Sequence, residues 1–440
     1  MLLLTHISHL CGIDHHHKPF LCGTEMQRFE TLSDAFLLVD DGRFSAFGPM
    51  SELPAEVLSN ASHIIDATGC AVMPSWCDPH THIVYAGSRE GEFVDKIRGL
   101  SYAEIARRGG GILNSADLLH TTDEDELYRQ AHGRALEVMA KGTGCLEIKS
   151  GYGLNLDDEL KMLRVIRRLR DTLPMRIVST FLGAHAVARG MSQEAYVDSV
   201  VNEMIPEVGR QQLADFVDVF CDEGFFTPSD TDRILSAATR WGMRPKIHAE
   251  ELAPSGGVAV GVKHGALSVD HLESMAPASI EVLRKQYAMT DDCNCADSSF
   301  STETSQPRHS VPTGPHTIPT ALPGTSFFLN IPNAPARRII DAGLPLAVAS
   351  DYNPGSTPSG DMKFIVSLAC IKLRLLPAEA FNAATLNAAA AMDLSRDYGS
   401  IALGKVANFF VTHPISSPDF IPYAYTTPLI SRVFLRGREV

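Results

Sequence analysis

The pattern of apolar and polar residues changes near residue 70. Before it, short apolar runs such as Phe36–Val39 and Phe44–Phe47 are separated by turn residues, which is typical of a small β unit. After it, short apolar runs alternate with longer segments in which apolar residues recur every three or four positions. This alternation of strands and helices indicates β/α units around a parallel sheet.

Eight apolar runs are expected to form that sheet: Ala71–Cys77, Cys145–Ile148, Ile177–Leu182, Phe216–Cys221, Pro245–Ile247, Leu267–Asp270, Tyr287–Thr290 and Leu344–Ser350. Helical patterns lie between most of them, for example Asp123–Lys141, Asp157–Thr172 and Ser229–Trp241. Eight strands over about 280 residues predict an α/β fold, a (β/α)8 TIM-like barrel with its active site at the C-terminal strand ends. A doubly wound open sheet is the alternative.

Two segments depart from this alternation. Residues 291–324, which follow the seventh expected strand, are rich in Ser, Thr and Pro and are expected to form a long inserted loop. An Ala-rich helix is expected from Pro377 to about Met392, and β-like runs at Asn408–Val411 and Ser431–Leu435 are expected to pair with the N-terminal β unit. The predicted domains are a small β-sandwich-like domain, residues 1–70 plus 395–440, and the barrel, residues 71–394 with its insertion.

Composition limits the possible functions. The 440 residues, 45% of them hydrophobic and 20% charged, describe an ordinary globular protein. The net charge of -14 argues against nucleic acid as a partner. No secretory signal pattern or apolar run of membrane-spanning length occurs, so no membrane partner is expected. Nine cysteines without a regular spacing favour reduced thiols, and therefore a cytoplasmic location.

Residue types that bind metals follow five of the eight predicted strands: His80 and His82 the first, His185 the third, His248 the fifth, His271 the sixth and Asp351 the eighth. A single histidine at a strand end is commonly an ordinary hydrogen-bonding residue. In a barrel, however, all strand ends meet on one face. Three imidazoles and one carboxylate, from His80, His82, His248 and Asp351, would bind one divalent metal ion and leave a position for water.

This set resembles the amidohydrolase superfamily, in which the first strand supplies His-x-His, the fifth and sixth each a His, and the eighth an Asp. Two-metal members add a carbamylated lysine at the end of strand four. Here that end is Phe220–Gly224, without a lysine, and Lys149 at strand two is expected to be a structural cation. The resemblance therefore implies a single metal ion, Zn or Fe, at His80, His82, His248 and Asp351.

Longer strings are similar to the imidazolonepropionase family: Asp78–Arg89, Gly109–Ile112, Glu147–Leu154, Leu182–His185, Asp218–Cys221, His248–Leu252 and Ser350–Pro354. The resemblance extends from about residue 71 to 412. Two features depart from it. Ser75-Trp76 stands where the family usually has glycine and a small aliphatic residue, and residues 291–324 look inserted. Neither departure touches an implied ligand.

The resemblance implies a hydrolase acting on a C–N bond of a cyclic amide, which converts 4-imidazolone-5-propanoate to N-formimidoyl-L-glutamate in histidine degradation. Asp351 would accept a proton from the metal-activated water, His271 would hold the water or stabilise the oxyanion, and Glu251 would contact the ring N–H groups or the leaving nitrogen. The implied substrate-binding residues are Arg89, for the propanoate, and Tyr102, Tyr152, His185, Glu251, Asn353, Gly355 and Ser356. The family analogy also implies a homodimer.

Alternatives remain at this stage. Another mononuclear amidohydrolase, such as a heterocycle aminohydrolase, would share the metal ligands without needing Arg89 opposite an acidic arm. A non-catalytic scaffold relative would be expected to lose ligands, and all four are present. Taken without the family, Arg89 is also compatible with a surface ion pair, Tyr152 with a packing role and Glu251 with an acidic residue in the first turn of a helix.

Overall fold

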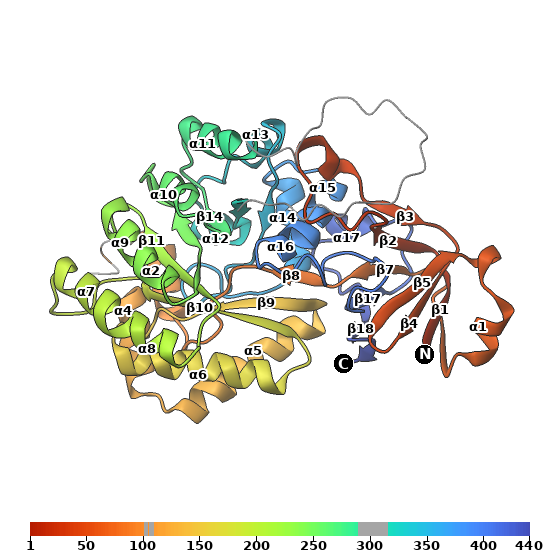
Figure 1. The fold of residues 1–440 in the computed structure, drawn as a ribbon, viewed down its shortest axis with the longest axis horizontal. Helices are drawn as coiled ribbons and strands as arrows, with labels where there is room; N and C mark the ends of the chain where they lie inside the picture. The colour runs from red at the N-terminus through yellow and green to blue at the C-terminus, as the bar shows by residue number, and fades with distance from the viewer. Residues whose placement is uncertain (101–103, 105–109, 289–315) are drawn as a thin grey trace.

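An eight-stranded parallel barrel forms the centre of the molecule, and two smaller sheets lie beside it (Figure 1). The computed structural model describes residues 1–100, 104, 110–288 and 316–440. The barrel strands are, in order, β8 (Trp76–Asp78), β9 (Thr143–Lys149), β10 (Arg176–Ala184), β11 (Phe216–Cys221), β13 (Ile247–Ala249), β14 (Ser268–His271), β15 (Ile318–Ala321) and β16 (Ala347–Val348), with β12 (Arg244–Pro245) beside β11. Neighbouring strands are all parallel, so the expected (β/α)8 barrel is confirmed and the doubly wound sheet is excluded.

The barrel closes between its first and last strands just beyond their named ends. The Asp351 N–H donates to the His80 carbonyl oxygen (3.0 Å), and the His82 N–H donates to that of Tyr352 (2.9 Å). Below them, both oxygens of the buried Asp78 carboxylate accept hydrogen bonds from Ser350, from its N–H (3.0 Å) and its Oγ (2.5 Å). Closure therefore joins two of the three segments that carry candidate metal ligands, the one with His80 and His82 and the one with Asp351.

Helices cover the outside of the barrel: α2 (Glu90–Ile97), α4 (Ile112–Thr121), α5 (Glu124–Ala140), α6 (Leu156–Thr172), α7 (Gln193–Ser199), α8 (Ile205–Arg210), α9 (Pro228–Thr239), α10 (Gly257–Lys263), α11 (Pro277–Ala288), α12 (Pro323–Leu329), α13 (Ala336–Asp341), α14 (Met362–Ile371), α15 (Pro377–Ala384) and α16 (Leu386–Ala390). A π-helical turn, η3 (Val200–Met204), joins α7 to α8. The three expected helices are confirmed as α5, α6 and α9. The helix expected from Pro377 is broken at Thr385.

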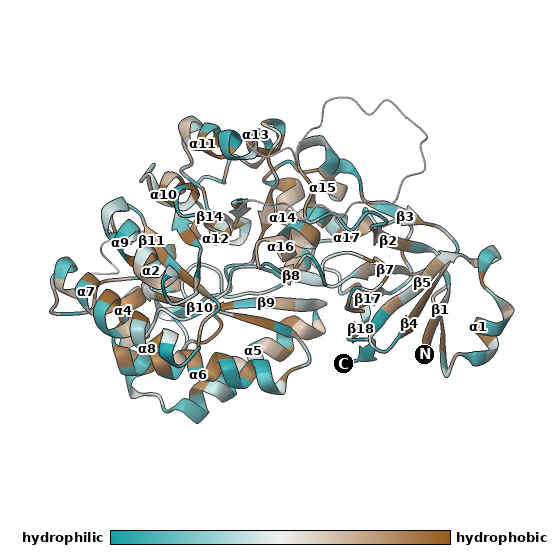
Figure 2. Ribbon diagram, in the orientation of Figure 1, coloured by the Kyte–Doolittle hydropathy of each residue, from teal (hydrophilic) through white to brown (hydrophobic). Residues whose placement is uncertain are grey.

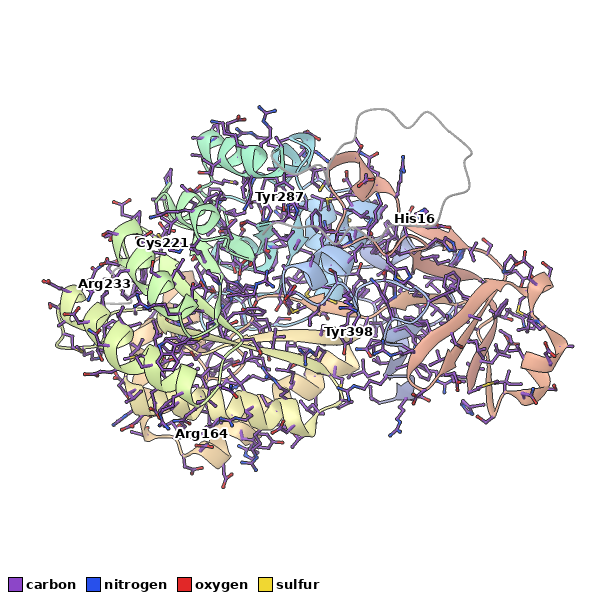
Figure 3. All side chains as sticks on the ribbon, in the orientation of Figure 1. His16, Arg164, Cys221, Arg233, Tyr287 and Tyr398 are labelled. Carbon is purple, nitrogen blue, oxygen red and sulfur yellow. The ribbon has the colours of Figure 1, made fainter. Side chains whose placement is uncertain are left out.

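These helices are amphipathic. Figure 2 shows apolar residues on the barrel strands and mixed apolar and polar residues along helices such as α5 and α6. Polar residues on the outside link neighbouring helices, and Figure 3 marks two of them: Arg164 on α6 pairs with Glu124 (2.8 Å), and Arg233 on α9 pairs with Asp198. No helix in the described part of the chain is both long and apolar enough to cross a membrane.

The run expected as the first strand serves two sheets. Its first half is β7 (Ala71–Pro74), which pairs with β2 (His9–Ile13) and β17 (Phe409–Thr412) in an end sheet. Its second half is β8 of the barrel. Between them, the Ser75 N–H donates to the Asn408 carbonyl oxygen (3.0 Å). Trp76 is fully buried at the junction, with its ring 4.9 Å from that of Phe410. Both halves are buried on both faces, so the sequence shows one continuous apolar run.

The expected seventh strand at residues 287–290 is wrong, because Tyr287 lies in α11. The seventh strand is β15, which lies inside the segment 291–324 that was expected to be an insertion after that strand. β15 is only four residues long and contains Pro and Thr, so it lacks the apolar run that marks the other strands. Its register with β14 is continuous from Ile318 to Ala321. Residues 291–315 of the segment lie outside the described residues.

Both chain ends contribute to the smaller sheets, as expected. One has the order β5 (Arg43–Pro49), β4 (Ala35–Asp40), β1 (Leu2–Ile7), β6 (His63–Asp66); the other has β19 (Arg438–Glu439), β18 (Ile430–Leu435), β17 (Phe409–Thr412), β7, β2 (His9–Ile13), β3 (Glu30–Leu32). Short helical turns complete this part: η1 (Gly23–Gln27), η2 (Met50–Glu52), α1 (Ala55–Asn60) and α17 (Phe420–Tyr423). The stacked rings of Phe409 and Phe434, 4.7 Å apart, lie in its core. The division into two domains at residues 70 and 395 stays a prediction.

The closure contact predicts a stability effect. Ser350→Ala removes the hydroxyl bond to Asp78, whose pKa burial raises to about 7 against the opposing effect of the Ser350 hydrogen bonds. We expect the free energy of unfolding to fall by about 1–3 kcal/mol, the usual cost of leaving a buried polar group without its partner. Urea unfolding followed by tryptophan fluorescence measures this, since Trp76 lies next to the closure. Ser59→Ala, in the exposed helix α1, is the control, and equal midpoints for the two variants would contradict the prediction.

Candidate active site

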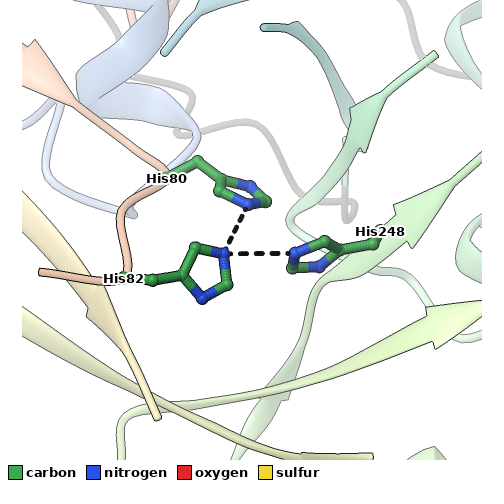
Figure 4. Close-up of side chains that lie close together, drawn as sticks. All are labelled: His80, His82 and His248. Carbon is green, nitrogen blue, oxygen red and sulfur yellow. Dashed lines mark hydrogen bonds between the residues drawn. The ribbon is translucent and has the colours of Figure 1, made fainter. Parts of the chain in front are cut away.

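Three imidazoles converge at the C-terminal end of the barrel (Figure 4). His80 and His82 follow β8, and His248 lies in β13. The His82 Nε2 lies 3.3 Å from the Nε2 of His80 and 3.4 Å from that of His248. All three side chains are almost completely buried. The structure thus brings His248 against His80 and His82, which lie about 170 residues earlier in the sequence.

The second ring nitrogen of two of these histidines is held by a carboxylate. The Nδ1 of His80 is 2.7 Å from Asp270, and that of His248 is 2.8 Å from Asp218. Burial, together with the charge of Lys149, lowers the pKa of His80 far below its usual value, so the ring is neutral. Each Nδ1–H donates to its carboxylate, and each Nε2 therefore presents a lone pair to the centre.

This arrangement fits a metal ion. Burial also lowers the pKa of His82 far below its usual value. A single hydrogen on its Nε2 could satisfy only one of the two facing lone pairs, whereas a divalent cation would accept all three nitrogens. The carboxylates behind His80 and His248 are the outer partners that metal-binding imidazoles commonly have.

Asp351 is the fourth polar group at this centre. Its Oδ1 lies 3.5 Å from the Nε2 of His82 and 3.7 Å from that of His80. Its Oδ2 accepts hydrogen bonds from Thr325 Oγ1 (2.6 Å) and Ser356 Oγ (3.1 Å). The backbone of Asp351 is left-handed (φ +55°), a strained conformation that occurs often at functional sites. One oxygen is therefore fixed by hydroxyls, and the other faces the imidazoles.

A buried charge cluster supports the site from inside the barrel. Lys149 Nζ lies 2.7 Å from Glu147, 2.8 Å from Asp218 and 3.6 Å from Asp270. Burial alone would lower the pKa of Lys149, but these carboxylates raise it overall. Lys246 donates to the Pro79 carbonyl oxygen (2.8 Å), directly before His80, and pairs with Glu147. Together with Asp351, which lies against His80 and His82, the site has four carboxylates and two lysines, and a divalent cation would balance the remaining formal charge.

A second acid–base group lies beside the imidazoles. His271 Nδ1 is 3.5 Å from one oxygen of Glu251 and 3.5 Å from one of Glu273. Burial would lower the pKa of His271, but these two carboxylates raise it well above its usual value. Burial raises the pKa of Glu251 to about 8. Glu273 was missed in the sequence, because only the left-handed turn at His271 and Leu272 (φ +83° and +73°) folds it back to the histidine.

A cavity of about 480 Å³ opens onto this group of residues. One part is lined by His82, His185, His248, His271, Glu251 and Asp351, and another by Arg89, Phe93, Lys96, Phe328 and Gly355. The loop that follows Asp351 connects the two parts, since a span of four residues, roughly 14 Å at most, separates Asp351 from Gly355. A ligand that spans this cavity would therefore contact both the candidate metal ligands and two cations, Arg89 and Lys96.

The residues predicted to bind substrate lie around this cavity. Arg89 is 9% exposed and donates to Glu92 through Nε (3.0 Å) and Nη2 (2.7 Å). A Cβ at Gly355 would overlap its guanidinium, so only glycine permits this approach. The ring of His185 stacks on His82 at 5.2 Å, and Tyr152 lies against both. Burial, with a contribution from His248, lowers the pKa of His185 to about 3.

The amide of Asn353 is occupied inside its own loop. Its Oδ1 accepts from the N–H groups of Gly355 (2.7 Å) and Ser356 (2.8 Å), and its Nδ2 donates to the Asp351 carbonyl oxygen and Ser356 Oγ (both 2.7 Å). Asn353 and Ser356 therefore shape the loop and Asp351, although both line the cavity. Their expected contacts with substrate stay predictions. The predicted residue Tyr102 lies outside the described residues.

The sequence did contain a pattern that marks the supporting residues. Each is a charged residue within or next to an apolar strand: Glu147, Asp218 and Asp270 lie inside strands, and Lys246 lies between β12 and β13. Charged side chains are almost never fully buried unless they are paired, so such positions indicate an internal network. Thr325 and Lys96 had no comparable pattern, because Thr325 directly follows the segment 291–324 that was expected to be an insertion and Lys96 lies on a partly exposed helix.

Comparisons with known proteins agree with this geometry. The amidohydrolase family matches residues 226–440. The imidazolonepropionase of Christiangramia forsetii is 49% identical over 441 residues, covering 100% of both chains, and that of Flavobacterium johnsoniae is 47% identical, covering 100% of this chain and 99% of its own. Solved structures with similar folds include a triazine hydrolase variant, with a TM-score of 0.72 and 16% identity, covering 100% of this chain and 94% of its own. Another is guanine deaminase from C. acetobutylicum, with a TM-score of 0.67 and 13% identity, covering 100% of this chain and 99% of its own. The structural matches show the fold alone, whereas the full-length identities decide the family. The chain belongs to the imidazolonepropionase family.

Proposed function

We propose that this chain hydrolyses 4-imidazolone-5-propanoate to N-formimidoyl-L-glutamate, a step in histidine degradation. The proposal rests on one cavity that is lined both by candidate metal ligands and by the buried Arg89. The chain is also 49% identical over its full length to an imidazolonepropionase. The substrate has a ring carbonyl for the first part of the cavity and a carboxylate for the second. A heterocycle aminohydrolase would not require Arg89 in this position, because its substrate need not carry an acidic arm.

The proposed metal ligands are His80, His82, His248 and Asp351, holding one divalent ion, zinc or iron. The converging lone pairs and the formal negative charge of the buried cluster support this assignment. When bound, such an ion makes water a nucleophile at neutral pH and polarises the carbonyl. His and Asp ligands suit both metals, so the donor set does not select between them.

Asp351 and His271 are the proposed catalytic residues for the attack. The Asp351 Oδ2 is held by two hydroxyls, which leaves its Oδ1 as the base that takes the proton from water. The water oxygen bonds to the ring carbonyl carbon, and negative charge develops on the carbonyl oxygen. His271, held cationic by the Glu273 carboxylate, stabilises that charge.

Glu251 is the proposed proton donor to the leaving nitrogen. Its pKa of about 8 keeps the carboxyl protonated at neutral pH, and the side chain lines the cavity. As the ring C–N bond breaks, this proton goes to the nitrogen, and the carbonyl carbon becomes the new carboxylate. Arg89 binds the propanoate arm, while Tyr152 and His185 pack against the ring.

We also propose that the chain works as a homodimer in the cytoplasm. Exposed apolar side chains at α14 and α17, Ile371 (61% exposed) and Tyr423 (78%), support a contact between subunits there. Light scattering of the purified chain would test it. The cysteines of the described ranges, such as the buried Cys77 and Cys145, are free thiols, which supports a reducing compartment. The barrel and the paired chain ends remain the proposed domains.

Metal analysis and a hydrolysis assay test the proposal together. The purified chain should contain about one equivalent of metal and hydrolyse 4-imidazolone-5-propanoate, and chelation should abolish activity until zinc or iron is returned. His82→Ala should weaken metal affinity by more than about 100-fold and remove turnover, since it deletes the central nitrogen. His16→Ala, in an exposed position (Figure 3), is the control. A metal-loaded chain that turns over guanine or cytosine, but not this substrate, would overturn the assignment.

The role of Glu251 predicts a change in pH dependence. Because its carboxyl loses a proton as pH rises through about 8, wild-type kcat/KM should fall above that pH. Glu251→Gln should lower kcat by about 100- to 10,000-fold and abolish this fall, since the amide cannot donate the proton. The exposed Glu223→Gln is the matched control. A variant that keeps the wild-type fall above pH 8 would show that another group donates the proton.

A further inference from the structure

A second cation lies beside Arg89 in the cavity. Arg89 is the N-cap of α2, and Glu92, Phe93 and Lys96 follow at helical spacings that place them on the same side. Arg89, Phe93 and Lys96 all line the cavity. Lys96 Nζ donates to the Gly355 carbonyl oxygen (2.9 Å), the residue that packs against the Arg89 guanidinium. Lys96 therefore lies at the same wall of the cavity as Arg89.

At this wall of the cavity, the positive charge of Lys96 is not paired with a carboxylate among the described residues. Two N–H groups of Arg89 already donate to one oxygen of Glu92. The other Glu92 oxygen accepts from the Gly111 N–H (3.0 Å) and the Asn114 amide (3.3 Å). Arg89 and Glu92 thus form a neutral pair, whereas Lys96 has no carboxylate partner among the described residues. The wall carries one net positive charge, which matches a single carboxylate.

Lys96 also retains the capacity to bind a ligand. An ammonium group has three N–H donors, and only the bond to Gly355 is made within the described residues. The ring of Phe328, 5.7 Å from Nζ, holds the side chain along the cavity wall. Burial, with the nearby charge of Arg89, lowers the pKa of Lys96, so an anion placed here would relieve both effects.

We propose that Lys96 donates directly to the carboxylate of the substrate, alongside Arg89, and so determines specificity for ligands whose ring carries one acidic arm. The inference rests on the proposed function for the identity of that arm. Arg89 supplies a planar donor whose position Glu92 fixes, and Lys96 supplies the charge. A ligand with a neutral arm of the same length loses the contact with Lys96 but keeps those to the imidazole end.

A structural role for Lys96 makes a different prediction. If it only anchored the loop through Gly355, its loss would disturb Asp351 and weaken every ligand equally. Lys96→Gln separates the two roles, because glutamine retains an N–H donor for Gly355 but removes the charge. Lys96→Arg retains the charge. Lys263→Gln, whose lysine pairs with Asp232 on the outer surface, controls for long-range electrostatics.

The test compares two stable probes, imidazole-4-propanoate and 4-propylimidazole, by calorimetry on the metal-loaded full chain. Lys96→Gln should weaken binding of the propanoate by about 10- to 100-fold, the range of a charge-assisted hydrogen bond, and leave propylimidazole within about twofold. Lys96→Arg should restore most of the loss, and Lys263→Gln should change neither. In turnover, Lys96→Gln should raise KM by a similar factor while kcat changes less than about threefold.

Two outcomes would overturn the inference: equal weakening of both probes, or unchanged binding of the propanoate in Lys96→Gln. Thermal midpoints of the variants, compared with wild type, identify a folding defect, and Lys96→Arg then provides the decisive comparison. The probes bind without turnover, so the outcome is independent of the reaction. A wild-type chain that discriminates between the probes through Lys96, but does not hydrolyse the imidazolone, would contradict the proposed function and not this inference.

Discussion

The buried charge cluster inside the barrel is the constraint on which the site depends. Lys149 and Lys246 hold Glu147, Asp218 and Asp270 in a region without solvent access, and two of these carboxylates then orient His248 and His80. Burying such charges is costly unless each finds partners, so removing any one lysine or carboxylate would leave the others uncompensated. Their arrangement leaves neutral imidazoles whose lone pairs meet at one point.

Barrel closure and site assembly use the same contacts. The backbone bonds from Asp351 to His80 and from His82 to Tyr352 join the first and last strands, and they also place three candidate ligands within reach of one another. One layer below, the hydrogen bonds from Ser350 to Asp78 stabilise the same junction between the first and last strands. The fold is therefore completed at the point where the chemistry is proposed, and a change in strand register there would separate the ligands.

The loop after Asp351 couples the two parts of the cavity. Its first residue faces the imidazoles, and Gly355 contacts both Arg89 and Lys96. Asn353 makes all its side-chain hydrogen bonds within this loop, which keeps the span between the two parts constant. Because this loop is rigid, binding of the acidic arm of the substrate at Arg89 and Lys96 would position the substrate ring at the imidazoles.

The sequence by itself determined the barrel, the pairing of the chain ends and the candidate ligands His80, His82, His248 and Asp351. It could do so because strands alternate with helices, and a barrel brings every C-terminal strand end to one face. It could not locate β15, which is short and contains Pro and Thr. It also could not divide the run 71–77 between two sheets, because the hydrophobic pattern of a strand indicates that the strand is buried but not which strand it pairs with. Only the tertiary structure decided that Glu273 meets His271, that Thr325 holds Asp351 and that Lys96 reaches Gly355, because these contacts depend on left-handed turns and on segments far apart in the chain.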